Sequence, residues 1–366
     1  MRSWYYKIIL LIWLSLILGQ PYLCFCDYIM MCTFFGNPVA KVFRMTEDGD
    51  ILTSGSIEIG GNPESLVFSP DGHWGLAGSH TTYYPPTQKT LVIGANQNRE
   101  IYSLGYVHCE TEKLAAISPD SRYGVYGADL KTLRMERNGD FFPILSNNPL
   151  IGGFYAPSSK ISNNFLTDGG YNNIIEFTLL DDGRTTTTGF SLDISPSDGG
   201  EDLEISPDGK TAIALGGSGG GSYCIAVLRI FPEGGFALVQ QFNSSSYNPM
   251  EVDFTPDSKY AIIVFWCENA NIRSYAIGAD SKLTEVGSTR ITPYTIPEDM
   301  AVTPDGKFAV TRVLEPPGSV FQVVRIYSDG SLEYLPEKNF GTTGAVSAID
   351  FLPPYQPYPE NSFVLY

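Results

Sequence analysis

One short pattern recurs along the chain: an apolar segment, then Ser/Thr-Pro-Asp-Gly/Ser, then a second apolar segment. Five clear copies and two weaker ones lie at 68–78, 117–127, 205–215, 254–264 and 302–312, and at 155–162 and 351–358. Pro presets φ for a turn, Asp bonds nearby amides, and Gly tolerates positive φ. Apolar residues alternate with other residues along the segment before the proline, as in a β-strand. Each copy therefore predicts two strands joined by a tight turn.

The spacing of these copies predicts the architecture. The anchoring prolines are Pro70, Pro119, Pro157, Pro207, Pro256, Pro304 and Pro353, spaced by 49, 38, 50, 49, 48 and 49 residues. Between them lie hairpin dipeptides, at Asp48-Gly49, Asn138-Gly139, Asp182-Gly183, Gly234-Gly235 and Asp329-Gly330. Four strands in a repeat of this length are typical of a β-propeller. We predict an all-β, seven-bladed propeller in one domain over 28–366, with one trimmed blade.

The two ends of the chain are predicted to complete the last blade together. The last repeat holds an inner strand near 345–352 and a further apolar segment at 362–366. Two N-terminal segments, at 39–45 and 51–59, read as the missing outer pair. Two strands from each end would close the ring and remove open strand edges.

The first 26 residues read as a secretory signal peptide. Arg2 and Lys7 precede an apolar run, Ile8 to Leu18, that is short for a bilayer span. Cleavage after Cys26 would export the remainder to the periplasm or the extracellular space, with an uncleaved anchor as the alternative. No other stretch predicts membrane contact.

Composition narrows the class of protein. The chain has 366 residues, a formal net charge of −17, 13% aromatic residues, 37 Gly and 25 Pro. The aromatic content excludes a disordered acidic chain, and the acid excess argues against a nucleic-acid partner. Beyond the signal segment lie four cysteines: Cys32, Cys109, Cys224 and Cys267. They permit two disulfides with three pairings, although the apolar surroundings of Cys224 and Cys267 favour buried free thiols.

Residues 260–288 and 306–333 resemble the lactonase-type seven-bladed propellers, which include 6-phosphogluconolactonase-like, carboxymuconate-cyclase-like and YVTN-repeat surface-layer proteins. The resemblance implies lactone hydrolysis and a Glu near Glu268. The Pro-Arg-His element of lactonases is absent, because Met250, Glu251 and Val252 occupy its place. A hydrolase would therefore use Glu268, Arg312 and His80 as base and polarising groups.

Acidic residues gather at equivalent positions in the inner strands of consecutive blades. The members before Pro207, Pro256 and Pro304 are Glu201, Asp202, Glu204, Glu251, Asp253, Glu298 and Asp299, and Asp350 follows in the last blade. Ring symmetry would bring them to one mouth of the central channel. They read either as solvated acids that cap turn amides or as a ligand site. Asp202, Glu251 and Asp299 are candidate Ca²⁺ ligands, the one cofactor considered.

Aromatic residues on the neighbouring loops, Tyr84 and Trp266, would add a contact surface for a small molecule or a protein ligand. The sequence thus favours an exported, non-enzymatic propeller that binds its ligand on this acidic, loop-rich face. The alternatives are a hydrolase of sugar or muconate lactones and a surface-layer or assembly scaffold.

Overall fold

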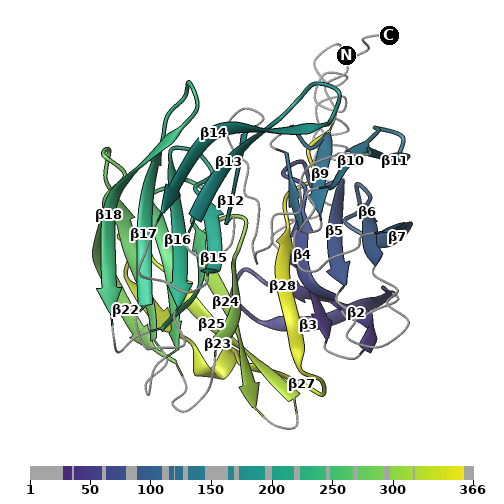
Figure 1. The fold of residues 1–366 in the computed structure, drawn as a ribbon. Helices are drawn as coiled ribbons and strands as arrows, with labels where there is room; N and C mark the ends of the chain where they lie inside the picture. Colours follow the sequence, from purple (N-terminus) through teal and green to yellow (C-terminus); the bar gives the residue numbers. More distant parts are fainter. Residues whose placement is uncertain are drawn as a thin grey trace, which may run out of the picture.

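The computed structural model describes residues 28–34, 37–59, 63–79, 89–108, 115–118, 120–126, 131–144, 164–168, 173–193, 200–217, 223–244, 248–266, 271–291, 297–315 and 318–357. In this part of the chain the strands form seven antiparallel sheets. The only helical element among these residues is a 3-10 turn, Pro336–Lys338. The all-β propeller predicted from the repeats is therefore confirmed (Figure 1).

Each sheet is one blade, in which the strands follow one another from the axis outward. Blade one is β4 (Pro63–Phe68), β5 (Trp74–Ser79), β6 (Lys89–Ala95) and β7 (Ile101–His108). Blade two is β8 (Ala115–Ile117), β9 (Tyr123–Tyr126), β10 (Lys131–Met135) and β11 (Phe141–Ile144). Blade three shows β12 (Asn164–Asp168), β13 (Asn173–Leu179) and β14 (Thr185–Asp193). The short strands of blade two account for the trimmed interval in the repeat spacing.

Most strands of the next three blades are longer than those of blade two. Blade four is β15 (Gly200–Ile205), β16 (Thr211–Gly217), β17 (Tyr223–Ile230) and β18 (Phe236–Ser244). Blade five is β19 (Asn248–Phe254), β20 (Tyr260–Trp266), β21 (Asn271–Ile277) and β22 (Leu283–Arg290). Blade six is β23 (Pro297–Val302), β24 (Phe308–Glu315), β25 (Gly318–Ile326) and β26 (Leu332–Tyr334), with β27 (Phe340–Thr342) also paired to β25.

Blade seven joins the two ends of the chain, but not as two strands from each. Its order is β28 (Val346–Leu352), β1 (Tyr28–Phe34), β2 (Asn37–Met45) and β3 (Ile51–Glu58). Figure 1 shows yellow β28 beside the purple and blue N-terminal strands. The prediction of a second C-terminal strand in this blade is wrong, because β1 occupies that place; residues 362–366 lie outside the described part. Met30 and Cys32 of β1 are fully buried, which explains why this apolar segment joins the sheet.

The ring is held together by one apolar cluster between each pair of neighbouring blades. Seven such clusters are present among the described residues, and one of them joins blade six to blade seven through Phe43, Phe321 and Phe351. The last blade also packs against the first, through Met31, Phe68 and neighbouring residues. Successive side chains of a strand point to opposite faces, so each strand supplies both adjoining clusters. Burial of these clusters is the main stabilising contribution to the ring.

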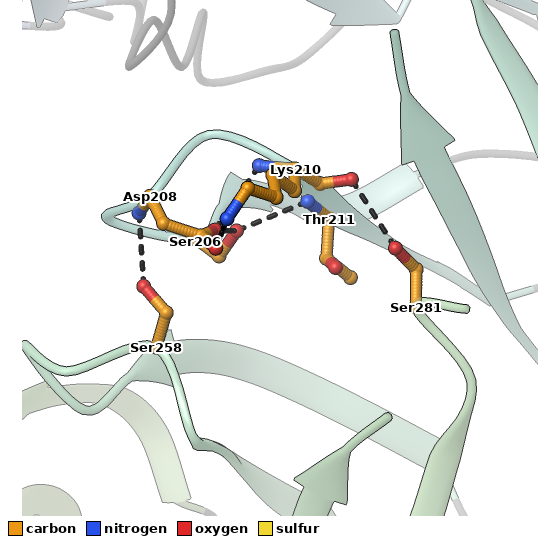
Figure 2. A network of polar contacts seen from close by, with 6 residues as sticks. All are labelled: Ser206, Asp208, Lys210, Thr211, Ser258 and Ser281. Atoms are coloured by element: carbon orange, nitrogen blue, oxygen red, sulfur yellow. Dashed lines mark hydrogen bonds and ion pairs between the residues drawn. The ribbon is translucent and has the colours of Figure 1, made fainter. Parts of the chain in front are cut away.

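The Ser/Thr-Pro-Asp turns are internally hydrogen-bonded. In blade four, the Ser206 hydroxyl donates to Asp208 Oδ1 (2.8 Å) and accepts the Thr211 amide (3.0 Å), as Figure 2 shows for the latter bond. The same two interactions recur at Ser118, Thr255 and Thr303. This local network explains why the motif repeats so faithfully: every bond lies within five residues of sequence.

Four non-glycine residues adopt left-handed backbone conformations in the described part, and each joins its blade to the preceding one. They are Arg99, Ser121, Ser258 and Ser281, with φ between 57° and 64°. Ser258 accepts the Asp208 amide (2.8 Å), and the Ser281 hydroxyl donates to the Lys210 carbonyl (3.3 Å), so blade five is bonded twice to blade four (Figure 2). Equivalent turns without such a bond hold glycine, for example Gly306.

The remaining expectations concern turns, thiols and the N-terminal segment. The five predicted hairpin glycines, Gly49 to Gly330, have positive φ as expected. Cys32 and Cys224 are buried free thiols, and burial raises the pKa of Cys224 to about 11; Cys109, Cys267 and the proposed signal peptide, 1–26, lie outside the described residues. No helix in the described part has the length and apolar character needed to cross a membrane.

Candidate functional site

The innermost strands surround the axis and leave one backbone edge without a strand partner. Strands β15, β19, β23 and β28 each pair with another strand on one side only, and each contacts the inner strand of the next blade. The amides on the free edge therefore need other acceptors. The acidic residues singled out in the sequence supply them.

Asp202 and Asp299 bridge from one inner strand to the next. Asp202 Oδ1 accepts the amide of Leu203 (2.8 Å), and its Oδ2 accepts the amide of Val252 in the next blade (2.9 Å). Asp299 repeats the arrangement with Met300 (2.9 Å) and with Ile349 (2.7 Å). Each carboxylate thus satisfies an amide of its own strand and ties two blades together.

Asp253 and Asp350 form a second set of bridges, two positions closer to the anchoring proline. Asp253 accepts the amides of Phe254 (2.6 Å) and Val302 (2.7 Å), and Asp350 those of Phe351 (2.7 Å) and Phe68 (3.0 Å). The two sets alternate around blades four to seven. We call the four residues Asp202, Asp253, Asp299 and Asp350 the bridging aspartates.

The described side chains on the inner strands of blades one and two include no such acids. In blades one and two the positions equivalent to Asp253 hold Val67 and Ala116. Val67 packs against the apolar cluster between these blades. Among the described side chains, the inner-strand acids therefore come from blades four to seven, and we call these acids the acidic wall.

Glu251 interacts electrostatically with four other acids of the acidic wall: Asp202, Asp299, Asp253 and Glu204. Burial raises its pKa well above the ordinary value, and the charges of Asp202 and Asp299 raise it further. Burial likewise raises the pKa of Asp202, with Glu204 adding to the effect, and that of Asp350, with Asp253 adding to it. Like charges close together in a poorly solvated place disfavour ionisation. The protonated form of these three carboxyl groups is therefore favoured.

Arg312 is the cation that faces these acids within the described residues. It lies on β24, opposite Asp299 in the strand register, and is 3% exposed. Burial raises the pKa of Asp299 to about 7 despite the opposing effect of the Arg312 charge. The candidate polarising residue is thus one strand from the axis, beside the acidic wall and not on the outer rim.

The other predicted site residues are either exposed or lie wholly or partly outside the described part of the chain. Glu201 and Glu298 lie in β15 and β23, but their side chains are outside the described part, as are Glu268, His80 and Tyr84 entirely. Trp266 ends β20 and is 44% exposed, and its role as a contact residue stays a prediction. The structure thus brings together Asp202, Glu251, Asp299 and Arg312.

The described side chains of the acidic wall form no cluster of metal ligands. No group of three or more His, Cys, Asp or Glu side chains in the described ranges is placed to hold a metal ion. Both oxygens of Asp202 and of Asp299 already accept amides. Calcium binding by Asp202, Glu251 and Asp299 stays a prediction from the sequence.

Comparisons with known proteins address the fold. No protein-family model matches the chain, and no curated protein matches it. Among solved structures, a 6-phosphogluconolactonase-like protein from Bacteroides fragilis aligns at TM-score 0.70 and 16% identity, covering 91% of this chain and 99% of that one. A periplasmic gluconolactonase from Pseudomonas aeruginosa aligns at TM-score 0.68 and 14% identity, covering 89% and 99%. The chain has the lactonase-type β-propeller fold. At such identities the likeness concerns architecture.

In this lactonase-type propeller two spatial arrangements were not predicted from the sequence: the common face of the bridging aspartates and the pairing of Arg312 with Asp299. The bridging aspartates lie five residues before Pro207 and Pro304 and three before Pro256 and Pro353. Both offsets are odd, and residues an even number of positions apart on a strand point to the same face. The sequence therefore indicates that the four aspartates lie on one face of their strands. The neighbourhood of Arg312 and Asp299 had no such signal, because it depends on the register between two strands.

Proposed function

We propose that this chain is an exported β-propeller that binds an uncharged or cationic, hydroxyl-rich small molecule in the acidic part of its channel. The observation that supports the proposal is the one-sided wall itself. Six carboxyl groups from four consecutive inner strands interact there: Asp202, Glu204, Glu251, Asp253, Asp299 and Asp350. Only one buried cation faces them in the described part, Arg312.

The charge of this wall sets the class of ligand. A phosphorylated or carboxylated sugar would meet like charge, whereas an amine would be attracted to it. Carboxyl groups that share protons near neutral pH both donate and accept hydrogen bonds, which suits sugar hydroxyls. Export through residues 1–26 remains part of the proposal and would place the site where sugars from outside the cell are encountered.

Hydrolysis of an unphosphorylated sugar lactone is the second candidate. Glu251 interacts with Asp299, which in turn faces Arg312, so a base of raised pKa and a guanidinium border the same wall. These are the two groups that lactone opening requires. The gluconolactonase from Pseudomonas aeruginosa and the 6-phosphogluconolactonase-like protein share the fold.

Differential scanning fluorimetry of the exported form with four probes tests binding: glucosamine, glucose, glucose 6-phosphate and Ca²⁺. A ligand that binds only the folded state raises the melting temperature. We expect the largest rise with glucosamine, a smaller one with glucose, and none with glucose 6-phosphate. A rise with glucose 6-phosphate alone would refute the charge argument, and a rise with Ca²⁺ alone would favour the calcium site.

A pH-stat assay with glucono-δ-lactone tests the second candidate. Acid release above the spontaneous rate should fall at least about tenfold in both Glu251→Gln and Arg312→Gln, because each removes a group that acts in the transition state. Glu233→Gln, an exposed acid in a blade-four turn, is the matched control. No release above the spontaneous rate leaves binding as the function.

A further inference from the structure

Strand β20 of blade five carries Trp266 on the face that packs against blade six. The strand has no irregularity in its pairing with β21, so Ile262, Val264 and Trp266 point to the same face. Ile262 and Val264 belong to the apolar cluster that blade five shares with blade six. Trp266 therefore lies on the blade-six face, at the end of the strand.

Three polar side chains of β19 share this face. Residues directly opposite each other in an antiparallel pair have neighbouring side chains on one face. The partners of Ile262, Val264 and Trp266 are, in that order, Asp253, Glu251 and Asn248. The bond from the Val302 amide of blade six to Asp253 agrees with this orientation. Two acids of the acidic wall are thus followed, toward the start of β19, by an amide beside an indole.

The amide of Asn248 is not satisfied by the fold. The residue is 8% exposed, and its side-chain oxygen is buried with no hydrogen-bond partner in the part of the chain that the structure describes. An unmade hydrogen bond at a buried polar atom costs free energy, so such atoms rarely lack a partner. A bound ligand with a hydroxyl group would supply the missing donor.

The indole of Trp266 is not required by the blade repeat. The bulge in the inner strand marks the same register in blades four, five and six, and the residue equivalent to Trp266 is Gly217 in blade four and Leu314 in blade six. Trp266 is also 44% exposed, so it adds little to the core. An exposed flat ring beside a polar amide suits a sugar, which has an apolar face and hydroxyls at its edge.

We propose that Asn248 and Trp266 form an outer subsite for a second sugar ring, so that the ligand of the channel is a disaccharide or longer. The inference rests on the binding function proposed above, with the inner ring at Glu251. A strand rises about 3.3 Å per residue, so Trp266 lies about 7 Å along β20 from the partner of Glu251. The outer ring stacks on the indole and donates a hydroxyl to Asn248, while the adjoining ring contacts the acid.

Isothermal titration of the full chain with glucosamine and with its β-1,4-linked dimer tests the proposal. The dimer should bind at least about tenfold more tightly, because it adds a stacked ring and a hydrogen bond. Trp266→Ala should remove this preference and leave the affinity for glucosamine unchanged. Tyr102→Ala, an equally exposed aromatic residue on the outer strand of blade one, is the matched control and should bind both ligands as wild type.

Asn248→Leu tests the amide separately, since it replaces the unpartnered group by an apolar one of similar size. The variant without ligand should melt slightly higher than wild type, and its affinity for the dimer should fall several-fold. A lower melting temperature would mean that the amide stabilises the fold, which would overturn its role in the subsite.

The titration also separates this inference from the function on which it rests. Equal affinity of wild type for glucosamine and for the dimer, or an unchanged preference in Trp266→Ala, would overturn the outer subsite and leave the channel function intact. Binding of neither ligand would refute both.

Discussion

Two groups of aspartates in this propeller accept similar hydrogen bonds, but one group is exposed and the other lies among buried acids. The turn aspartates, such as Asp208 and Asp257, accept a hydroxyl and an amide within their own turn and pair with a lysine two residues later. Burial opposes ionisation there, but the Lys210 and Ser206 bonds lower the pKa of Asp208. The bridging aspartates accept amides too, yet burial and neighbouring acids raise the pKa of Asp202 and Asp350.

The difference shows what each group contributes. A turn aspartate is exposed and pairs with its own lysine, so its ionised form is stabilised within its own turn. A bridging aspartate joins two blades, and its charge is opposed by like charges on the same wall. We infer that the acidic wall is retained for a ligand at some loss of stability, as is common for functional sites.

Removal of one bridging aspartate should have the largest effect on stability. Asp299→Ala takes the acceptor from the amides of Met300 and Ile349 and the anionic neighbour from Arg312. The free energy of unfolding should fall by about 3 kcal/mol, as when one partner of a buried pair is removed. Urea denaturation at pH 8 measures it.

Asp257→Ala is the matched control in a turn. It removes bonds from Thr255 and the Lys259 amide and an exposed ion pair, for a loss of about 1 kcal/mol. Equal losses in the two variants would show that the bridges between blades add nothing beyond a local cap.

The pH dependence of stability should separate the two groups next. Asp299 has a folded pKa of about 7 against an ordinary 3.8, so between these values the folded state binds the proton that the unfolded state releases. Stability from the acidic wall is therefore lost as the pH rises from about 4 to 7. The turn aspartates, with lowered pKa, contribute stability above pH 3.8 that is lost below it.

Urea midpoints between pH 3 and 9 should accordingly pass through a maximum near pH 4 to 5 and decline by pH 8. A midpoint that rises steadily up to pH 8 would mean that the acidic wall is fully ionised and compensated.

A smaller effect is expected at the left-handed serines. Ser258→Ala keeps the strained backbone and removes the acceptor of the Asp208 amide, for a loss of about 1 kcal/mol. Ser258→Gly removes the same bond but relieves the backbone, so it should lose only a few tenths of a kcal/mol. Thermal unfolding of both variants measures the difference; a glycine variant less stable than the alanine variant would exclude backbone strain at this turn.

The sequence predicted what depends on residues close together along the chain. The Ser206-Pro207-Asp208 type of turn, the hairpin glycines and the blade count all follow from local bonding and spacing. The strand order of blade seven did not follow, because both 362–366 and Tyr28–Phe34 are apolar enough to fill the second place. The bridges from Asp202 and Asp299 depend on contacts between blades, which local patterns do not encode.

The most direct test of the account is the melting temperature of Glu251→Gln at pH 7.5, with and without glucosamine. The substitution removes an ionisable group from the centre of the acidic wall while keeping the size of the side chain. Without ligand the variant should melt higher than wild type, because repulsion is relieved, and glucosamine should no longer raise its melting temperature. A variant that melts lower than wild type, or that responds to glucosamine as wild type does, would contradict the claim that these acids serve a ligand at a loss of stability.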